Sequence, residues 1–249
     1  MTNNALAVDV SEDWLAACDI QRRFMGSLDG RTERVDYSAQ CRQLRALGGD
    51  CYDFTTLAEN CLALTIGDAS GKGLAAALMI SSVQSALRTA AIFSGGDLAA
   101  ALGALNRQVN ASSSGNRYAT LFYGVFDGAS RKLHYVNAGH NPPMVIRRDG
   151  SAACLEAGGA PVGMFPDWNY EEIVVQLSEG DVVLAYTDGI IEAANPSGEE
   201  WGVEGLRSAV VKNCEKGTDE IVRAVFTSMD EFSRGCQTDD ATALALRIN

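Results

Sequence analysis

Apolar residues recur along most of this chain in short segments of the kind that form β-strands. Residues 35–41 alternate apolar and polar positions, as a half-buried strand does. The apolar runs at 51–57 and 61–66 are separated by Ala58-Glu59-Asn60 and predict a hairpin. Further strands are predicted at 118–126, 133–139, 144–149, 172–177, 181–188 and 241–248. Short loops between consecutive strands imply antiparallel pairing.

Longer segments with helical spacing separate these strand runs. Two helices are predicted at about 72–93 and 97–111, the second with Asp97 as its N-cap. Two more are predicted at 203–213 and 218–234. Helices that lie apart from runs of hairpin-linked strands favour an α+β layered sandwich over a doubly wound parallel sheet.

The N-terminal segment predicts one further helix, over residues 9–28. Asp9 and Glu12 have the spacing of a capping box, and apolar residues follow at roughly helical intervals. This helix either packs on its own domain or binds a partner or a second copy through the large Trp14 side chain. We therefore expect residues 1–40, the helix and first strand, to precede one domain over residues 41–249.

Composition and charge exclude several classes of function. The net charge is −12 with a pI near 4.6, which argues against nucleic acid or an anionic membrane as the main partner. The seven cysteines lack CxxC spacing, which indicates reduced thiols in a cytoplasmic protein. The N-terminus does not resemble a signal peptide, and we expect no apolar run long enough to span a membrane.

Carboxylates stand at the ends of four predicted strands. Asp50 opens one strand, Asp68 and Asp188 each follow an apolar run, and Asp239-Asp240 precede the last strand. An Asp beside a Gly is a common turn signal, so turn formation is one explanation. If these strands share a sandwich, however, the carboxylates converge, and converged carboxylates repel unless they are protonated or bind a cation. Oxygen ligands favour Mg²⁺ or Mn²⁺.

Two bound cations would also let an acidic protein act on phosphate. They attract a phosphate dianion and lower the pKa of a bound water. The segment Asp68–Gly73 contains Gly71-Lys72-Gly73 but lacks the pattern of a nucleotide P-loop.

Seven motifs in order resemble one family. They are GGDCYDF, IGDASGKGLAAALM, YATLFYGVFD, VNAGHNPP, PVGM, LAYTDGIIEA and TDDATAL, and they extend from about residue 20 to residue 248. Together they resemble the sporulation-phosphatase (SpoIIE/RsbU-like) branch of the metal-dependent 2C-type (PPM) protein phosphatases. The resemblance implies a four-layer αββα sandwich with two antiparallel sheets. It also implies hydrolysis of phosphoserine or phosphothreonine in proteins by metal-activated water, with two Mn²⁺ or Mg²⁺ ions per active site.

The resemblance also implies roles for individual residues. Asp50 and Asp68 are implied as catalytic metal ligands, with Asp68 bridging both ions. The full implied ligand set is Asp50, Asp68, the Ala69 carbonyl, Asp188 and Asp239, with Asp53 and Asp240 as further candidates.

The chain departs from eukaryotic relatives at two positions. They carry Asp-Gly-His where this chain has Asp68-Ala69-Ser70, so a His that could protonate the leaving group is missing and water would serve instead. They also use an upstream Arg to grip phosphate; Arg45 stands five residues before Asp50 and is the candidate, although a solvated Arg at a strand entry explains it equally well.

Both histidines have simpler interpretations than catalysis. His140 follows a strand and precedes two prolines, which favours a turn held by its hydrogen bonds over a ligand or acid role. His134 lies within a strand and is expected to pack there.

The resemblance further implies a partner-switching circuit. The substrate would be a phosphorylated anti-sigma-factor antagonist, and the N-terminal helix resembles the segment that connects a sensor to the phosphatase. Because only about forty residues precede GGD, we expect regulation by a separate partner or homodimer, or constitutive activity. Two alternatives stay open. One is a catalytically weak binding module of the same circuit, which four Asp ligand positions disfavour; the other is a metallohydrolase of small phosphoesters.

Overall fold

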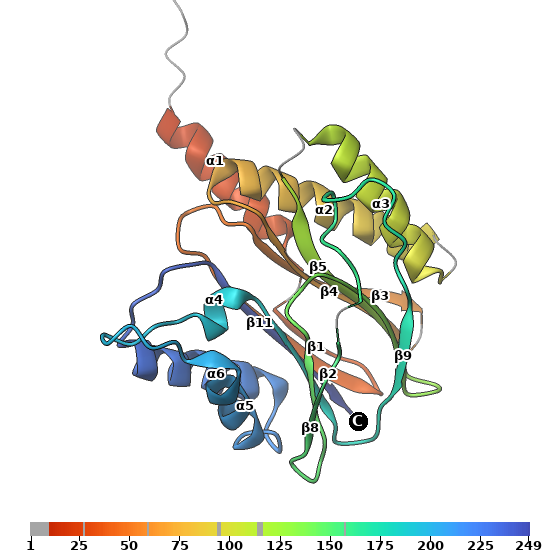
Figure 1. The fold of residues 1–249 in the computed structure, drawn as a ribbon. Helices are drawn as coiled ribbons and strands as arrows, with labels where there is room; N and C mark the ends of the chain where they lie inside the picture. Colours follow the sequence, from red (N-terminus) through yellow and green to blue (C-terminus); the bar gives the residue numbers. More distant parts are fainter. Residues whose placement is uncertain (1–9, 27, 59, 94–95, 114–116, 157) are drawn as a thin grey trace, which may run out of the picture.

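Two antiparallel sheets lie face to face in the computed structural model, which describes residues 10–26, 28–58, 60–93, 96–113, 117–156 and 158–249 (Figure 1). The strand order of the first, sheet A, is β1 (Asp29–Arg31), β2 (Val35–Arg42), β11 (Ala241–Ile248), β10 (Val182–Tyr186), β7 (Met144–Ile146) and β8 (Ala152–Cys154). The order in sheet B is β3 (Asp50–Ala58), β4 (Cys61–Ala69), β5 (Ala119–Asp127), β6 (Lys132–Ala138) and β9 (Ile173–Gln176).

The main core lies between the two sheets. In β4, Leu62, Leu64 and Ile66 point to one face because side chains alternate along a strand. They pack in one buried cluster with Phe122 of β5 and Leu244 of β11. Each sheet therefore contributes one apolar face, as the alternating sequence pattern predicts.

Helices cover the outer face of each sheet. Helices α2 (Leu74–Phe93) and α3 (Leu98–Ser112) lie on sheet B, and α5 (Gly202–Val211) and α6 (Thr218–Ser233) lie on sheet A (Figure 1). The predicted cap of α3 is present, since the Asp97 carboxylate accepts a hydrogen bond from Ala100 N at 2.8 Å. The order helix, sheet, sheet, helix confirms the predicted αββα sandwich.

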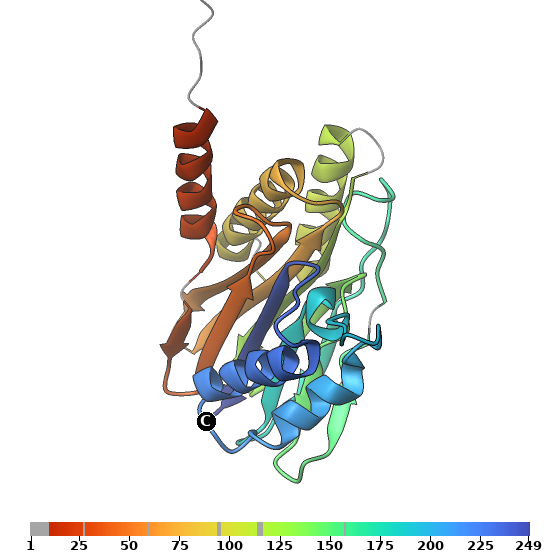
Figure 2. The same ribbon diagram turned by 90° about the vertical axis from the view of Figure 1, so that its left-hand side faces the viewer.

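Helix α1 (Val10–Phe24) lies beside α2, at the edge of that layer (Figure 2). Its predicted C-terminal end at residue 28 is wrong, because the helix ends at Phe24 and the chain turns into the short strand β1. Asp9, the predicted cap, lies outside the described residues. The sequence pattern also missed β1, β8 and the four-residue helix α4 (Asp188–Ile191), which are too short to show a period.

The predicted boundary between residues 40 and 41 falls inside β2. This strand pairs with β11 along its whole length, from Val35↔Ile248 to Arg42↔Ala241. The first long strand is therefore part of the sandwich and not of a separate N-terminal unit. A regulatory role for α1 stays a prediction.

The expectation about membrane-length segments is wrong for α2. Residues Leu74–Ile92 are long and apolar enough, by length and composition alone, to cross a membrane. In the structure this helix lies against sheet B, where Ala76, Ile80, Val83 and Leu87 are buried.

Candidate functional site

One end of the sandwich collects the carboxylates that the sequence placed at strand ends. Asp50 begins β3 and is paired directly with Asp68 near the end of β4. Both side chains share the face that carries Tyr52 and Ile66, so they point toward sheet A. At the same end of sheet A, Asp188 follows β10 and Asp239 precedes β11.

Asp50 is fixed between the two sheets. Its carboxylate is buried, and Oδ2 accepts hydrogen bonds from Thr187 Oγ1 at 2.8 Å and Thr242 Oγ1 at 2.6 Å. Burial, followed by the neighbouring Asp68, raises the pKa of Asp50 well above its usual range, while the two hydroxyls oppose this shift. Neither threonine was predicted to have a role, although Thr187 directly precedes Asp188 and Thr242 lies two residues after Asp240.

Asp68 and the Ala69 carbonyl present their oxygens together. A Cβ added to Gly49 would lie 3.0 Å from the Ala69 carbonyl oxygen and 3.1 Å from Asp68 Oδ1, so a residue without a side chain is favoured there. Among the described residues, no hydrogen bond reaches the Asp68 carboxylate. Burial and then Asp188, Asp239 and Asp240 raise the pKa of Asp68 to about 7.

The loops that carry Asp188 and Asp239 touch each other. A Cβ on Gly189 would lie 1.9 Å from the Asp240 carbonyl oxygen and 3.4 Å from Asp239 Cβ. Burial and then Asp239 raise the pKa of Asp188. Because Asp188 and Asp239, which flank strands of sheet A, raise the pKa of Asp68 in sheet B, the site favours a positive charge.

Lys72 supplies part of that charge. Its Nζ lies 2.7 Å from Asp239 Oδ2 and donates to the Thr238 carbonyl at 3.1 Å. No role was predicted for Lys72 from the sequence. The sequence could have indicated a role, since Lys72 is the basic residue of the loop that follows Asp68.

The donor set fits hard divalent cations, although the side chains are not preassembled around one. Among the described residues, no three carboxylate, thiol or imidazole groups form a compact metal-binding cluster. Four carboxylates and one backbone carbonyl nonetheless point to the same end of the sandwich, and Mg²⁺ and Mn²⁺ prefer such oxygen donors with water completing their coordination.

Two other candidate carboxylates are already held by protein groups. Asp53 is on the opposite face of β3 from Asp50 and forms an ion pair with Arg88 of α2 at 2.7 Å. The Asp240 carboxylate accepts hydrogen bonds from Leu44 N and Gly49 N, each at 2.7 Å, and so holds the loop before Asp50. Both carboxylates are therefore already bound by protein groups and do not join the candidate ligands.

Arg45 is exposed beside the loop that follows Asp68. Its Nη1 would lie 3.6 Å from a Cβ added to Gly73. This places the guanidinium beside the loop that also carries Lys72.

His140 forms the predicted turn. Its backbone N–H donates to Asn137 Oδ1 at 2.8 Å, and Asn137 Nδ2 donates to its carbonyl at 3.1 Å. The ring is buried, which lowers its pKa to about 4, with the nearby Tyr186 backbone opposing the shift. His134 is a partly buried strand residue that contacts Glu172 at 2.8 Å.

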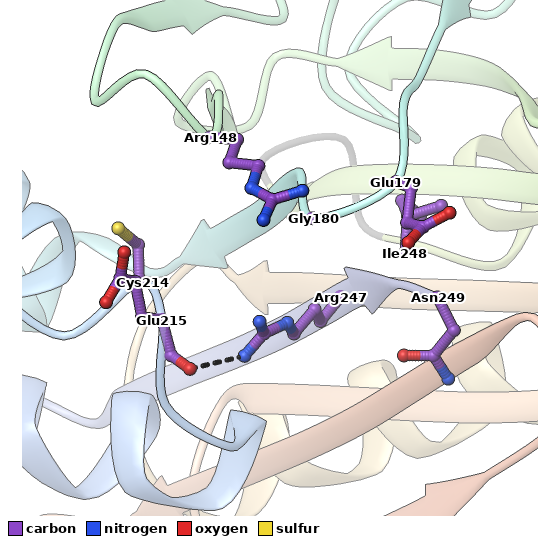
Figure 3. A pocket seen from close by; sticks show the side chains of 8 residues that line it. All are labelled: Arg148, Glu179, Gly180, Cys214, Glu215, Arg247, Ile248 and Asn249. Atoms are coloured by element: carbon purple, nitrogen blue, oxygen red, sulfur yellow. Dashed lines mark hydrogen bonds between the residues drawn. The ribbon is translucent and has the colours of Figure 1, made fainter.

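The opposite end of the sandwich contains a cavity of about 420 Å³ (Figure 3). It lies where β10 begins and β11 ends, and Arg148, Glu179, Glu215 and Arg247 line it. None of the candidate ligands lines this cavity, so its mixed charges are separate from the carboxylate site.

Comparisons with known proteins agree with this arrangement. The model of the stage II sporulation protein E (SpoIIE) family matches residues 58–249. The chain is 27% identical to protein IcfG of Synechocystis sp. over 92% of its length and spans 40% of that relative. It is 24% identical to the phosphoserine phosphatase RsbU of Bacillus subtilis, with 99% of this chain and 73% of RsbU covered. The SiaA-PP2C domain of Pseudomonas aeruginosa has a similar fold, with a TM-score of 0.79, 22% identity, and coverage of 96% of this chain and 97% of that one.

Proposed function

The chain belongs to the stage II sporulation protein E (SpoIIE) family, and from this membership we propose that it is a metal-dependent protein serine/threonine phosphatase. The observation that carries the proposal is the set of mutually repelling carboxylates at one end of the sandwich. A site that raises the pKa of Asp50, Asp68 and Asp188 together is costly to ionise unless a cation binds there.

The proposed ligands are Asp50, Asp68, the Ala69 carbonyl, Asp188 and Asp239, around two Mn²⁺ or Mg²⁺ ions. Asp68 is the candidate for contact with both ions, because its pKa is raised by Asp188 and Asp239 from sheet A and it faces Asp50 in sheet B. Divalent cations, when bound, supply a water of lowered pKa and stabilise the charge of the phosphoryl group during in-line displacement.

The chain's own side chains orient the site and attract the substrate. Thr187 and Thr242 fix Asp50, and the exposed Arg45 is the proposed phosphate-binding residue. Ser70 stands where the eukaryotic relatives have the His, and an alcohol is too weak an acid to replace an imidazolium; its Oγ accepts a hydrogen bond from Tyr118 N at 3.0 Å. Protonation of the leaving group is therefore left to water, and we expect single-step hydrolysis without a phosphoenzyme.

The substrate is proposed to be phosphoserine or phosphothreonine on a folded protein, namely an anti-sigma-factor antagonist. The relative RsbU is a phosphoserine phosphatase by name, which supports this class of substrate. A site formed by strand ends and loops recognises mainly the phosphate, so selectivity must come from the surrounding surface.

One assay series tests this function against the alternatives. Hydrolysis of an aryl phosphate, an intact phosphorylated antagonist and a peptide copied from its phosphosite is measured with and without Mn²⁺. We expect Mn²⁺-dependent turnover and a higher kcat/KM for the intact protein than for the peptide. Faster turnover of a nucleotide would favour a small-phosphoester hydrolase, and binding without turnover would favour a binding module.

Helix α1 is proposed to regulate this site through Gln21. Gln21 is buried; its Nε2 donates to the Gly48 carbonyl at 2.8 Å and its Oε1 accepts from Gly48 N at 3.2 Å. Gly48 is two residues before Asp50, so a shift of α1 would move the loop that carries this ligand. Leu15 and Ile20 are 69% and 55% exposed on the same helix, which leaves apolar surface for a partner or a second copy.

Removing the Gln21 side chain tests this connection. We expect Gln21→Ala to weaken Mn²⁺-dependent turnover, whereas Arg22→Ala, on the exposed side of the helix, should not. Dimerisation is measured separately by sedimentation with Leu15→Glu. Unchanged turnover in Gln21→Ala would show that α1 does not act through Gly48.

The proposed location is the cytoplasm, where the acidic chain would meet its phosphoprotein.

A further inference from the structure

Lys72 is the basic side chain that contacts the proposed metal ligands. Its Nζ lies 2.7 Å from Asp239 Oδ2 and donates a hydrogen bond to the Thr238 carbonyl at 3.1 Å. Among the described residues, no other lysine, arginine or histidine side chain is within ion-pair distance of a proposed ligand carboxylate. Lys72 therefore gives Asp239 a cationic partner that the other ligand carboxylates lack.

The local structure does not by itself favour a lysine at this position. Helix α2 begins at Leu74, and a positive charge just before a helix N-terminus is unfavourable because the exposed N–H groups there are partly positive. Gly71 and Gly73 flank the lysine at φ +91° and +77°, and a Cβ added to Gly71 would meet no atom within 4 Å. Asp239 is therefore the partner that accounts for Lys72, and the loop has open space beside it.

Both carboxylate oxygens of Asp239 already have partners. Oδ1 accepts a hydrogen bond from the Asp240 backbone N–H at 2.9 Å, and Oδ2 is bound by Lys72. An ammonium and a divalent cation on the same oxygen would repel each other strongly, so the two exclude one another. The backbone donor is fixed by the chain, whereas the Lys72 side chain is 46% exposed and can turn into water. Lys72 is therefore the partner that can leave.

The charge of Lys72 also acts on two other proposed ligands. Burial is the main cause that raises the pKa of Asp68 and of Asp188, and Lys72 opposes the rise in both. Two divalent cations would balance the ligand carboxylates without Lys72, so its charge is needed there only while the site lacks metal.

We propose that Lys72 occupies the place of a divalent cation at Asp239 in the metal-free protein and must leave this carboxylate before it can bind a metal. This inference rests on the proposed function, because it takes Asp239 as a metal ligand. An exposed ion pair changes an equilibrium constant by only about two- to fivefold, so divalent cations can displace Lys72. The pair thus stabilises the metal-free site and lowers its metal affinity modestly.

Two simpler roles for Lys72 predict different results. If Lys72 only anchors the loop before β11 through the Thr238 carbonyl, its loss would weaken Mn²⁺ binding. If it only attracts the phosphate of the substrate, its loss would raise KM and leave Mn²⁺ affinity unchanged. Only competition with the metal predicts tighter Mn²⁺ binding when the ammonium is removed.

Mn²⁺ affinity of the full chain is measured by isothermal titration calorimetry, starting from metal-free protein. We expect Lys72→Met to bind Mn²⁺ about fivefold more tightly than wild type, because the competing charge is gone. Lys72→Gln keeps a hydrogen-bond donor but no charge and should bind as tightly as Lys72→Met. Lys72→Arg retains the charge and should stay within about twofold of wild type. Lys212→Met removes an exposed charge at the C-cap of α5 and should leave the affinity unchanged, which excludes a general effect of net charge.

Urea unfolding with and without Mn²⁺ tests whether metal binding breaks the ion pair. In chelator, Lys72→Met should be less stable than wild type, and the same change made in Asp239→Asn should have no such effect. In saturating Mn²⁺ the difference should disappear or reverse, because the pair is then absent from both proteins and the variant gains more from the metal. An equal difference in both conditions would overturn the proposal, since Lys72 would then stay on Asp239 in the presence of metal.

The titrations separate this inference from the proposed function. If wild type binds Mn²⁺ and Lys72→Met binds it equally or more weakly, Lys72 does not compete for Asp239, and the metal site stands. Wild-type affinity in Lys72→Gln would also contradict the proposal, because the hydrogen bond and not the charge would then matter. If wild type does not bind Mn²⁺, the proposed function is wrong and this inference is wrong with it.

Discussion

Acidic residues at the two ends of the sandwich have different neighbours. At the end where β10 begins, Asp181 forms an ion pair with Arg147, and Glu179 faces Arg131 at 3.5 Å. At the end where β10 finishes, Asp50 and Asp68 are paired, and burial followed by neighbouring carboxylates raises the pKa of each. The first arrangement neutralises charge inside the protein, whereas the second leaves negative charge that a cation must neutralise.

This difference separates structural carboxylates from proposed ligands better than sequence position does. Asp181 and Asp188 flank the same strand, and both stand beside a glycine. Only their surroundings distinguish them, since an arginine reaches Asp181 while Asp188 is near Asp239.

The largest expected effect comes from removing one charge at the ligand end. Asp68→Asn should lower kcat for a phosphoprotein on the order of 10³-fold, because several kcal/mol of transition-state stabilisation depend on the cations. Without metal, the same variant should be more stable to urea than wild type, since Asp68 is ionised only at a cost. Near wild-type turnover would show that Asp68 does not hold a metal.

The matching change at the other end, Asp181→Asn, should lower stability and leave turnover almost unchanged. Asp181 is buried and also accepts a hydrogen bond from Ser178 N at 2.8 Å. Asp181→Asn leaves Arg147 without its partner and should lower the free energy of unfolding by about 2 kcal/mol. Mn²⁺-dependent kcat should stay within about twofold, given the distance between the ends. A loss of turnover in an Asp181→Asn variant that is as stable as wild type would show that the two ends of the sandwich do not differ in this way.

Two exposed arginines offer a smaller contrast. Arg45→Ala should raise KM for the phosphorylated substrate about tenfold with little change in kcat, because the guanidinium contributes binding of about 1.4 kcal/mol. Arg148→Ala, in the cavity of Figure 3, is the control and should change neither parameter. Equal effects of both variants would indicate general attraction of phosphate by positive charge and not a specific contact.

The last contrast concerns the pH dependence of stability in metal-free protein. Between pH 3.8, the ordinary pKa of Asp, and about 7, folded Asp68 binds a proton that the unfolded chain releases. This group therefore lowers the free energy of unfolding as pH rises through that window, by at most about 1.4 kcal/mol per pH unit. Urea titrations of wild type and Asp68→Asn should diverge in this direction, and a pH-independent difference would contradict it.

The sequence predicted the sandwich because each layer has its own period. Alternation in residues 35–41 and the apolar run at 241–248 mark strands, and Asp97 marks the start of α3. The pairing of β2 with β11, which joins the two ends of the sequence, left no local signal, so the predicted boundary fell inside a strand. Three-residue strands such as β8 are defined by hydrogen bonds to a neighbour and not by their own pattern.

The candidate site was predictable only as far as residue type allowed. Carboxylates at strand ends were visible, but which face of a strand they occupy depends on register. Asp50 and Asp53 are three residues apart and point to opposite sides of β3, the latter toward Arg88. Thr120 and His140 are twenty residues apart, and only the folded β5–β6 hairpin brings their side chains within 2.9 Å of each other.

The most direct test of the central claim is the number of Mn²⁺ ions that the chain binds. Isothermal titration calorimetry of the metal-free full chain gives this stoichiometry, with Asp68→Asn and Asp181→Asn measured alongside. We expect two ions per chain in wild type and in Asp181→Asn, and loss of both sites in Asp68→Asn. No binding in wild type, or unchanged binding in Asp68→Asn, would contradict the proposal that the unneutralised end of the sandwich is the metal centre.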